Sequence, residues 1–143
     1  MQVGQLIEGR SRSDIISCAP DVALGEAVRI LAERRIGAMP VMEGDRVVGI
    51  ISERDVLYCL AAEGASSLAK SVREVMTAEP ITTTPDSTII QALGLMTRRR
   101  VRHLPVTEGD SLVGFVSIGD LVKSRLDEIS HEAEAMRDYI RMA

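Results

Sequence analysis

The sequence predicts an α+β fold in which two β-α-β-β-α repeats pack about a pseudo-twofold axis and a C-terminal helix follows them. Three observations lead to this expectation. The 143-residue chain matches itself at one fixed offset, each copy shows the same order of helical and extended patterns, and a further helical pattern follows the second copy. With 45% hydrophobic and 27% charged residues, the chain has the composition of an ordinary globular protein.

The internal repeat extends over 37 positions. Residues 20–56 align with residues 85–121 without a gap, at an offset of 65, and 14 of the 37 pairs are identical. Most other pairs match one apolar residue with another, which indicates a duplication. One copy alone has too little apolar surface to form a core, so we expect the two copies to share one core and to form two equivalent clefts where they meet. The identical pairs include Pro20/Pro85, Asp21/Asp86, Ala27/Ala92, Arg34/Arg99, Pro40/Pro105, Gly49/Gly114, Ser52/Ser117 and Asp55/Asp120.

Each copy begins with a short extended stretch, at residues 15–17 and 81–84, followed by a Pro-Asp pair. Aspartate is a favoured N-cap, so Asp21 and Asp86 are expected to cap the next helix. Apolar residues then recur at helical spacing. They are Leu24, Ala27, Val28 and Leu31 in the first copy, and Ile89, Leu93 and Met96 in the second.

A β-hairpin is predicted after each of these helices. Its turn is the sequence Glu-Gly-Asp, because Gly and Asp tolerate positive φ. A second helix then starts at Ser52 or Ser117. First strand, turn and second strand cover residues 39–41, 43–45 and 47–51 in the first copy, and 104–106, 108–110 and 112–116 in the second.

An amphipathic pattern continues beyond the second copy. Apolar residues spaced 4, 3, 4, 3 and 4 apart predict one helix over about residues 120–141 with a heptad seam. Two interpretations stay open: the helix packs on its own module, or it forms a dimer contact. We divide the sequence into one motif at 1–66, a second at 67–127 and a helical extension at 128–143. The seam consists of Val122, Leu126, Ile129, Ala133, Met136 and Ile140.

Composition argues against several classes of function. A net charge of −4 and only three aromatic residues disfavour nucleic-acid binding. No apolar run approaches the roughly 18 residues of a membrane span, and the N-terminus lacks the pattern of a signal peptide, so a cytoplasmic protein is expected. Cys18 and Cys59 are expected to be reduced thiols, and neither they nor His103 and His131 have the spacing of a metal site.

The duplicated motifs resemble a tandem pair of cystathionine-β-synthase (CBS) motifs, called a Bateman module, over about residues 3–127. The second copy, residues 76–123, is close to the family pattern along its whole length, and the first is more divergent. RHLPV (102–106), GDLV (119–122) and the Tyr-Ile pair at 139–140 are similar to stand-alone CBS-pair proteins of bacteria and plant organelles. The resemblance implies a non-catalytic module that binds AMP, ADP, ATP, NAD(H) or S-adenosylmethionine and requires no other cofactor.

The family signature Ser/Thr-x-x-Asp is present twice, ending at Asp55 and Asp120. The resemblance implies that each Asp accepts hydrogen bonds from the ribose hydroxyls, that each Ser contacts ribose or phosphate, and that the backbone near Ile81 or Ile16 reads adenine. A carboxylate and a helix N-terminus suit these groups chemically. By the same resemblance, the first cleft comprises Ile50, Ser52, Asp55, Thr77, Pro80, Ile81, Val101, Arg102 and His103, and the second Ser11, Ile16, Ile36, Gly37, Ala38, Phe115, Ser117 and Asp120.

Several polar residues have a second interpretation. Ser-x-x-Asp is close to a capping box, and one Ser can both cap its helix and bind a ligand. Arg98 and Arg99 are typical of a solvated helix end. Arg54 is either a surface charge or a phosphate contact.

The two clefts are not expected to be equal. Arg102 and His103 in the first favour a polyphosphate or a dinucleotide, because cations offset phosphate charge. The second has Gly37 and Ala38 at the matching positions. It is expected to bind a simpler adenosine ligand, or to bind weakly.

The expected function is regulation of another protein. The module is expected to signal energy or redox state to a partner protein and, by analogy with the family, to form a homodimer. Plant relatives are associated with thioredoxin systems, but no residue here specifies that partner. Catalysis is not expected, because there is no catalytic domain of the kind attached to some CBS pairs and no matched nucleophile and base. The alternative is a ligand-free interaction or dimerisation module, against which the two retained Ser-x-x-Asp signatures argue.

Overall fold

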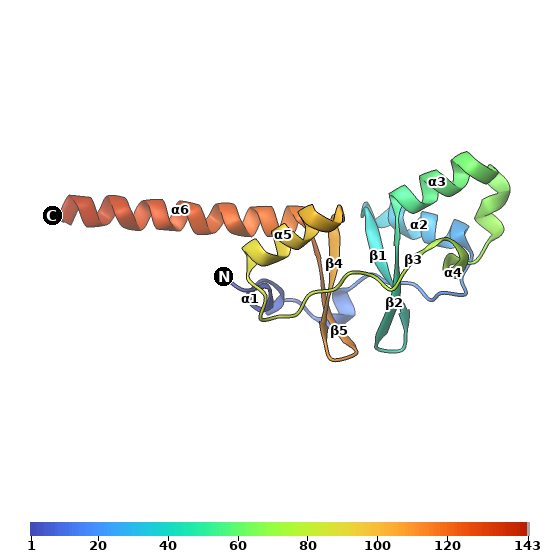
Figure 1. The fold of residues 1–143 in the computed structure, drawn as a ribbon, viewed down its shortest axis with the longest axis horizontal. Helices are drawn as coiled ribbons and strands as arrows, with labels where there is room; N and C mark the ends of the chain where they lie inside the picture. Colours follow the sequence, from blue (N-terminus) through green and yellow to red (C-terminus); the bar gives the residue numbers. More distant parts are fainter. Residues whose placement is uncertain (143) are drawn as a thin grey trace.

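The computed structural model describes residues 1–142. Figure 1 shows two similar α+β units side by side and one long helix that projects from the second. The predicted fold class is therefore confirmed. In chain order the elements are α1 (Val3–Ile7), the 3₁₀ helix η1 (Arg12–Asp14), α2 (Leu24–Arg34), β1 (Ala38–Glu43), β2 (Arg46–Ser52), α3 (Glu53–Glu63), the 3₁₀ helix η2 (Ala65–Ala69), α4 (Val72–Val75), β3 (Thr77–Ala78), α5 (Ile89–Arg99), β4 (His103–Glu108), β5 (Ser111–Ser117) and α6 (Ile118–Met142).

The two predicted hairpins are confirmed and have the same register. Ala38 pairs with Ser52 in β1–β2, and His103 pairs with Ser117 in β4–β5. In each hairpin a bulge shifts the register directly after the same valine, Val41 in β1 and Val106 in β4. Each turn contains a glycine with positive φ, 61° at Gly44 and 60° at Gly109. This repetition of register, bulge and turn expresses the duplication in three dimensions.

The extended stretch predicted at the start of each copy forms only a single bridge, at Thr83 within the predicted 81–84 but at Cys18, one residue after the predicted 15–17, in the first copy. Cys18 forms a parallel bridge to Val41, with hydrogen bonds to Pro40 O and from Met42 N. To extend this pairing toward residue 16, Pro40 would have to donate a backbone N–H, and to extend it beyond Cys18, Pro20 would have to donate one. Proline has no backbone N–H, so the pairing stops at one bridge. The second copy has the same arrangement at Thr83 and Val106, between Pro85 and Pro105.

The expected N-caps are wrong. Helix α2 begins after Ala23, and α5 begins after Thr88, whose hydroxyl accepts a hydrogen bond from Gln91 N at 3.0 Å. Ala23 and Thr88 are each bridged to the segment that crosses from the other copy, so the chain stays extended for two residues beyond the aspartate. Asp21 instead lies 3.5 Å from the Arg73 guanidinium.

Each copy has its own hydrophobic core instead of one shared core. Helix α1, before the first repeat, lies against the second copy, and α4 lies against the first (Figure 1). Val3 and Ile7 of α1 belong to the core of the second copy, and Val72 of α4 belongs to the core of the first. A backbone hydrogen bond from Leu112 N to Asp45 O joins the two hairpins. The two copies are therefore interlocked by exchanged segments. The buried residues are Ile89, Ala92, Met96, Leu104, Val106, Val116 and Leu121 in the second core, and Cys18, Leu24, Ala27, Leu31, Met39, Val41, Ile51 and Val56 in the first.

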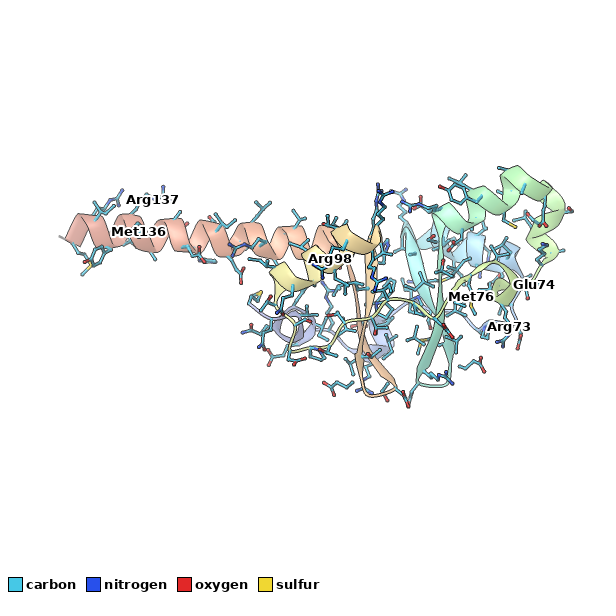
Figure 2. The ribbon with its side chains drawn as sticks, viewed as in Figure 1. Arg73, Glu74, Met76, Arg98, Met136 and Arg137 are labelled. Atoms are coloured by element: carbon cyan, nitrogen blue, oxygen red, sulfur yellow. The ribbon has the colours of Figure 1, made fainter. Side chains whose placement is uncertain are left out.

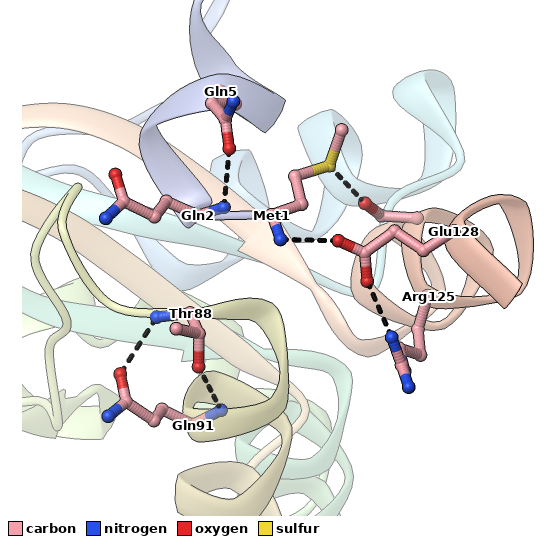
Figure 3. A network of polar contacts seen from close by, with 8 residues as sticks. Met1, Gln2, Gln5, Thr88, Gln91, Arg125 and Glu128 are labelled. Carbon is pink, nitrogen blue, oxygen red and sulfur yellow. Dashed lines mark hydrogen bonds and ion pairs between the residues drawn. The ribbon is translucent and has the colours of Figure 1, made fainter. Parts of the chain in front are cut away.

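The C-terminal pattern forms one continuous helix, α6. Its start is fixed to the module: Leu121 and Ser124 are buried, and the N-terminal amine of Met1 pairs with Glu128 at 2.5 Å (Figure 3). From Ile129 to Met142 every residue is exposed. Of the two interpretations of this helix, packing on its own module therefore applies only to the part before Ile129. Among the described residues, no helix combines the length and apolar character that crossing a bilayer requires.

Candidate functional site

The structure brings together all nine residues expected in the first cleft. They line a cavity of about 640 Å³ between the N-terminus of α3, strand β3 and the segment that leads into β4. That volume is in the range of small-molecule sites. The lining also contains residues that the sequence did not assign to it: Gly37, Ala38, Glu53, Arg54, Leu57, Tyr58, Glu79 and Arg100.

Asp55 is held in place at the N-terminus of α3. One carboxylate oxygen accepts hydrogen bonds from the Ser52 backbone N–H and hydroxyl, both at 3.0 Å. The other accepts the Thr77 hydroxyl at 3.2 Å. Asp55 N in turn donates to Ser52 Oγ at 3.2 Å, so the capping interpretation of Ser52 is confirmed. A role of Ser52 and Asp55 in ligand binding stays a prediction. Since a carboxylate has about four acceptor positions and three are used, Asp55 keeps about one free position, on the oxygen that faces Thr77.

Three arginines lie around this cleft. Arg102 was expected there, Arg54 enters from the first turn of α3, and Arg100 follows α5. Arg100 adopts φ 55°, which ends the helix and directs the chain toward β4. Arg98 and Arg99 lie in the last turn of α5 and are not part of the lining, in agreement with a solvated helix end. Because Glu53, Asp55 and Glu79 also line the cleft, any preference for phosphate depends on the placement of the arginines rather than on an excess of positive charge.

His103 separates the two clefts. It lines the first, and its ring is stacked on Phe115 of the second, with 5.6 Å between centroids and 13° between planes. Burial lowers the pKa of His103, although Asp120 and Glu53 act in the opposite direction. A side chain at Gly37 would begin 3.3 Å from the Glu53 carboxylate and 3.4 Å from the His103 ring, so Gly37 lies against the first cleft.

The second cleft is much smaller, about 150 Å³. Of its expected residues, Ser11, Ile16, Ile36, Ala38 and Phe115 line it, whereas Gly37, Ser117 and Asp120 do not. The remaining lining residues are Ile7, Arg10, Asp14, Ile15, Val113 and Gly114.

Asp120 has a charged neighbour that Asp55 does not have. It accepts the Ser117 backbone N–H at 2.9 Å and lies 3.4 Å from the Arg10 guanidinium. Burial alone would raise the pKa of Asp120, but the hydrogen bonds from Ser117 and the charge of Arg10 outweigh it, and the pKa lies below its ordinary value. The repeat gives no signal for Arg10, because this residue precedes the aligned region.

The difference between the clefts follows from the segment that enters each one. In the first, β3 extends the sheet by pairing Thr77 with Ile50. In the second, α1 and η1 take that place, and Ile7 approaches so closely that a Cβ on Gly114 would lie 2.9 Å from it. The equivalent Gly49 is approached as closely, by Met76 Sδ at 2.5 Å, but Met76 does not line the first cleft, whereas Ile7 lines the second.

The fold and these paired clefts define a tandem CBS module. The chain belongs to the CBS domain family, whose pattern matches residues 3–62 and 72–127. It is 36% identical over 129 residues to the mitochondrial CBS domain-containing protein CBSX3 of Arabidopsis thaliana, which corresponds to 87% of this chain and 63% of that protein. A crystal structure of a CBS-domain protein from Agrobacterium tumefaciens has 41% identity and a TM-score of 0.80, and covers 87% of this chain and 92% of its own.

The chain spans only part of several relatives. It corresponds to 63% of the length of CBSX3 and to 22% of an inosine-5′-monophosphate dehydrogenase of Korarchaeum cryptofilum, to which it is 37% identical over 76% of its own length. The similarity to that enzyme is thus confined to a fraction of the enzyme.

Two more distant structures share the fold and contain adenosine ligands. CBSX2 of Arabidopsis thaliana, solved in complex with AMP, is 22% identical with a TM-score of 0.77 over 88% of this chain and 97% of its own. Protein MJ0100, solved with 5′-methylthioadenosine and S-adenosyl-L-methionine, is 23% identical with a TM-score of 0.76 over 90% of this chain and 98% of its own.

Proposed function

We propose that this chain is a non-catalytic regulatory module that binds one adenine nucleotide in its first cleft and signals its presence to a partner protein. One observation carries the proposal: the Asp55 carboxylate and three arginines line the same cavity of about 640 Å³. The equivalent carboxylate, Asp120, lies instead against Arg10, beside a cavity of about 150 Å³.

The ribose and the base are assigned from the chemistry of the lining. Asp55, whose oxygens are oriented by Ser52 and Thr77, accepts one ribose hydroxyl at its free acceptor position. It accepts the second ribose hydroxyl when the Ser52 hydroxyl turns away from the carboxylate. The aliphatic groups of Ile50 and Ile81 flank the adenine ring. The AMP complex of CBSX2 and the adenosyl complexes of MJ0100 support an adenosine ligand in this fold.

The phosphates are assigned to the cationic side of the cleft. Arg54, Arg100 and Arg102 can donate charge-assisted hydrogen bonds, and His103 adds a further donor. With more than one arginine available, we favour ATP, ADP or NAD(H) over AMP. Adenosine without phosphate is expected to bind most weakly.

Signalling is assigned to helix α3. This helix begins at the ligand-binding Ser52–Asp55 turn, and its Leu57 and Tyr58 side chains line the cleft while exposing 62% and 70% of their surface. A nucleotide in the cleft would therefore alter a surface that a partner protein can contact. Through this surface the module would report energy or redox state.

The test is isothermal titration of the protein with AMP, ATP, NADH and S-adenosylmethionine. Asp55→Ala and Asp120→Ala are a matched pair, because each removes the same capping interaction. We expect Asp55→Ala to abolish nucleotide binding and Asp120→Ala to leave it unchanged. Equal loss in both variants contradicts the assignment to the first cleft. No heat from any ligand supports the alternative, a ligand-free interaction module, and turnover of ATP or NADH contradicts the non-catalytic assignment.

A further inference from the structure

Helix α6 has an exposed apolar seam along its projecting part. Leu126, Ile129, Met136 and Ile140 expose 60%, 46%, 60% and 64% of their surface, and Ala133 completes the spacing. Figure 2 shows Met136 far from the body of the module. The 14 residues from 129 to 142 have no tertiary contact that buries them, so a partner on this seam would stabilise this part of the helix.

The base of the helix sets the direction in which this seam points. The Met1 amine pairs with Glu128, and Arg125 pairs with Glu128 at 3.0 Å (Figure 3). Ser124 is buried. Folding the distal half back onto the module would require a break in the continuous helix. The partner of the seam is therefore another molecule.

We propose that the partner is a second copy of this chain, and that two α6 helices form a short parallel coiled coil. In heptad notation, Leu126, Ala133 and Ile140 occupy position a, while Ile129 and Met136 occupy position d. Each of these side chains packs against its equivalent in the second copy.

The charges beside the seam are complementary to those of a second copy. Glu132 lies at position g and Arg137 at the following position e, so in a parallel pair Glu132 faces Arg137 of the second copy, and symmetry produces this contact twice. Within residues 1–142 neither side chain takes part in an ion pair. Arg137 lies on the projecting part of the helix (Figure 2).

An antiparallel pair and a membrane surface fit less well. An antiparallel pair centred on the seam at residue 131 would place Glu132 against its own copy and Lys123 against Arg137, and both contacts are repulsive. The projecting part contains Glu132, Glu134 and Asp138 besides two arginines, so it has no basic face that would favour an anionic lipid surface.

The seam has fewer than three heptads, so we expect it to bury less than the roughly 1,600 Å² of a standard interface. The dimer is therefore expected to dissociate at about micromolar concentration, so association must be measured over a concentration series. Sedimentation velocity of the full chain is expected to show a monomer–dimer equilibrium. Ile129→Glu and Met136→Glu should each raise the dissociation constant by about tenfold or more, because each places a charge in the seam. His131→Glu, on the opposite face, should leave it unchanged.

Charge exchange and cross-linking test the parallel arrangement directly. Glu132→Arg and Arg137→Glu should each weaken the dimer, and the double variant should restore it. In a Cys59→Ser background, Met136→Cys is expected to form a disulfide-linked dimer on oxidation, because position 136 meets itself only in the parallel register. Circular dichroism confirms that each variant is folded. Four results would each overturn the proposal. Two concern association itself: no association in the concentration series, or a dimer that persists in the Ile129→Glu and Met136→Glu variants. Two concern the parallel arrangement: a double charge variant that does not restore association, or folded Met136→Cys that does not cross-link.

Discussion

The Arg10 guanidinium lies 3.4 Å from the Asp120 carboxylate, whereas the equivalent Asp55 carboxylate faces the neutral Thr77 hydroxyl at 3.2 Å. Arg10 reaches this position because α1, from before the first repeat, packs in the core of the second copy. The charged group that a ribose would have to displace is thus present in only one of the two clefts.

Removal of Arg10 is expected to open the second cleft. In Arg10→Ala, Asp120 loses its ion pair and the cavity gains the volume of the guanidinium side chain. We expect titration calorimetry to change from one adenine nucleotide per chain to two, with the new site absent from Arg10→Ala/Asp120→Ala. Arg12→Ala is the control, because Arg12 is exposed and does not line the cavity. A stoichiometry of one in folded Arg10→Ala shows that Ile7, rather than Arg10, closes the cleft.

Arg102→Gln should weaken phosphate binding selectively. A hydrogen bond to a charged group contributes about 1.5–3 kcal/mol, so the affinity for ATP should fall by roughly 10- to 100-fold while the affinity for adenosine changes little. Arg99→Gln serves as the control, since Arg99 lies in α5 outside the cleft lining. Fluorescence or calorimetric titration with both ligands makes the comparison. An equal loss for ATP and adenosine indicates that Arg102 shapes the cleft and does not contact phosphate.

Nucleotide binding should strengthen as the pH falls from about 8 to about 6. Burial lowers the pKa of His103 in the free protein below its ordinary value of 6.5, so the ring is neutral at pH 7. Phosphate beside the ring favours the imidazolium and raises this pKa, and binding therefore takes up a proton. Calorimetry in buffers of different ionisation enthalpy measures that proton. The uptake should vanish in His103→Gln, and a pH-independent affinity in the unmodified protein argues against phosphate at His103.

The same pKa shift predicts the direction of a stability change. As the pH falls through 6.5, the unfolded chain takes up a proton at His103 before the folded chain does. The free energy of unfolding therefore decreases with falling pH in this range, and His103→Gln should flatten the profile. Urea unfolding between pH 5 and 8 provides the measurement, and a parallel profile in the variant assigns the dependence to other groups.

Much of the fold could be predicted because the decisive signals are local and occur twice. The Glu-Gly-Asp turns and the helix starts at Ser52 and Ser117 depend only on neighbouring residues. The same signal occurs at the matching position of both copies, which strengthened each prediction. The prediction of Asp21 and Asp86 as N-caps was wrong because β-bridges to segments from the other copy hold Ala23 and Thr88 in extended conformation. These bridges outweigh the capping preference of an aspartate.

The candidate site shows the same division between local and long-range signals. All nine residues expected in the first cleft line it, because the repeat and the family pattern place them. The inequality of the clefts was expected from Arg102 and His103, but its largest structural cause is the entry of Ile7 and Arg10 from outside the repeat. A repeat alignment contains no information on residues that it does not align.

The close approach of β3 to Gly49 leads to a prediction for stability. A Cβ at this position would lie 2.5 Å from Met76 Sδ and 2.9 Å from Thr77 O. The Met76 side chain can move, but the Thr77 carbonyl cannot without loosening β3, which pairs with β2 at Gly49 and Ile50. Gly49→Ala should therefore lower the free energy of unfolding by about 1–3 kcal/mol, measured by urea denaturation.

The same substitution should weaken nucleotide binding, because Thr77 donates to Asp55 and any shift of β3 moves this hydroxyl away from the carboxylate. Gly9→Ala is the control, since no atom lies within 4 Å of its added methyl group. That variant should be as stable as the unmodified protein or slightly more stable, because alanine restricts the unfolded chain. If Gly49→Ala loses stability but retains full affinity, β3 relaxes without moving Thr77, and the orientation of Asp55 depends on Ser52 alone.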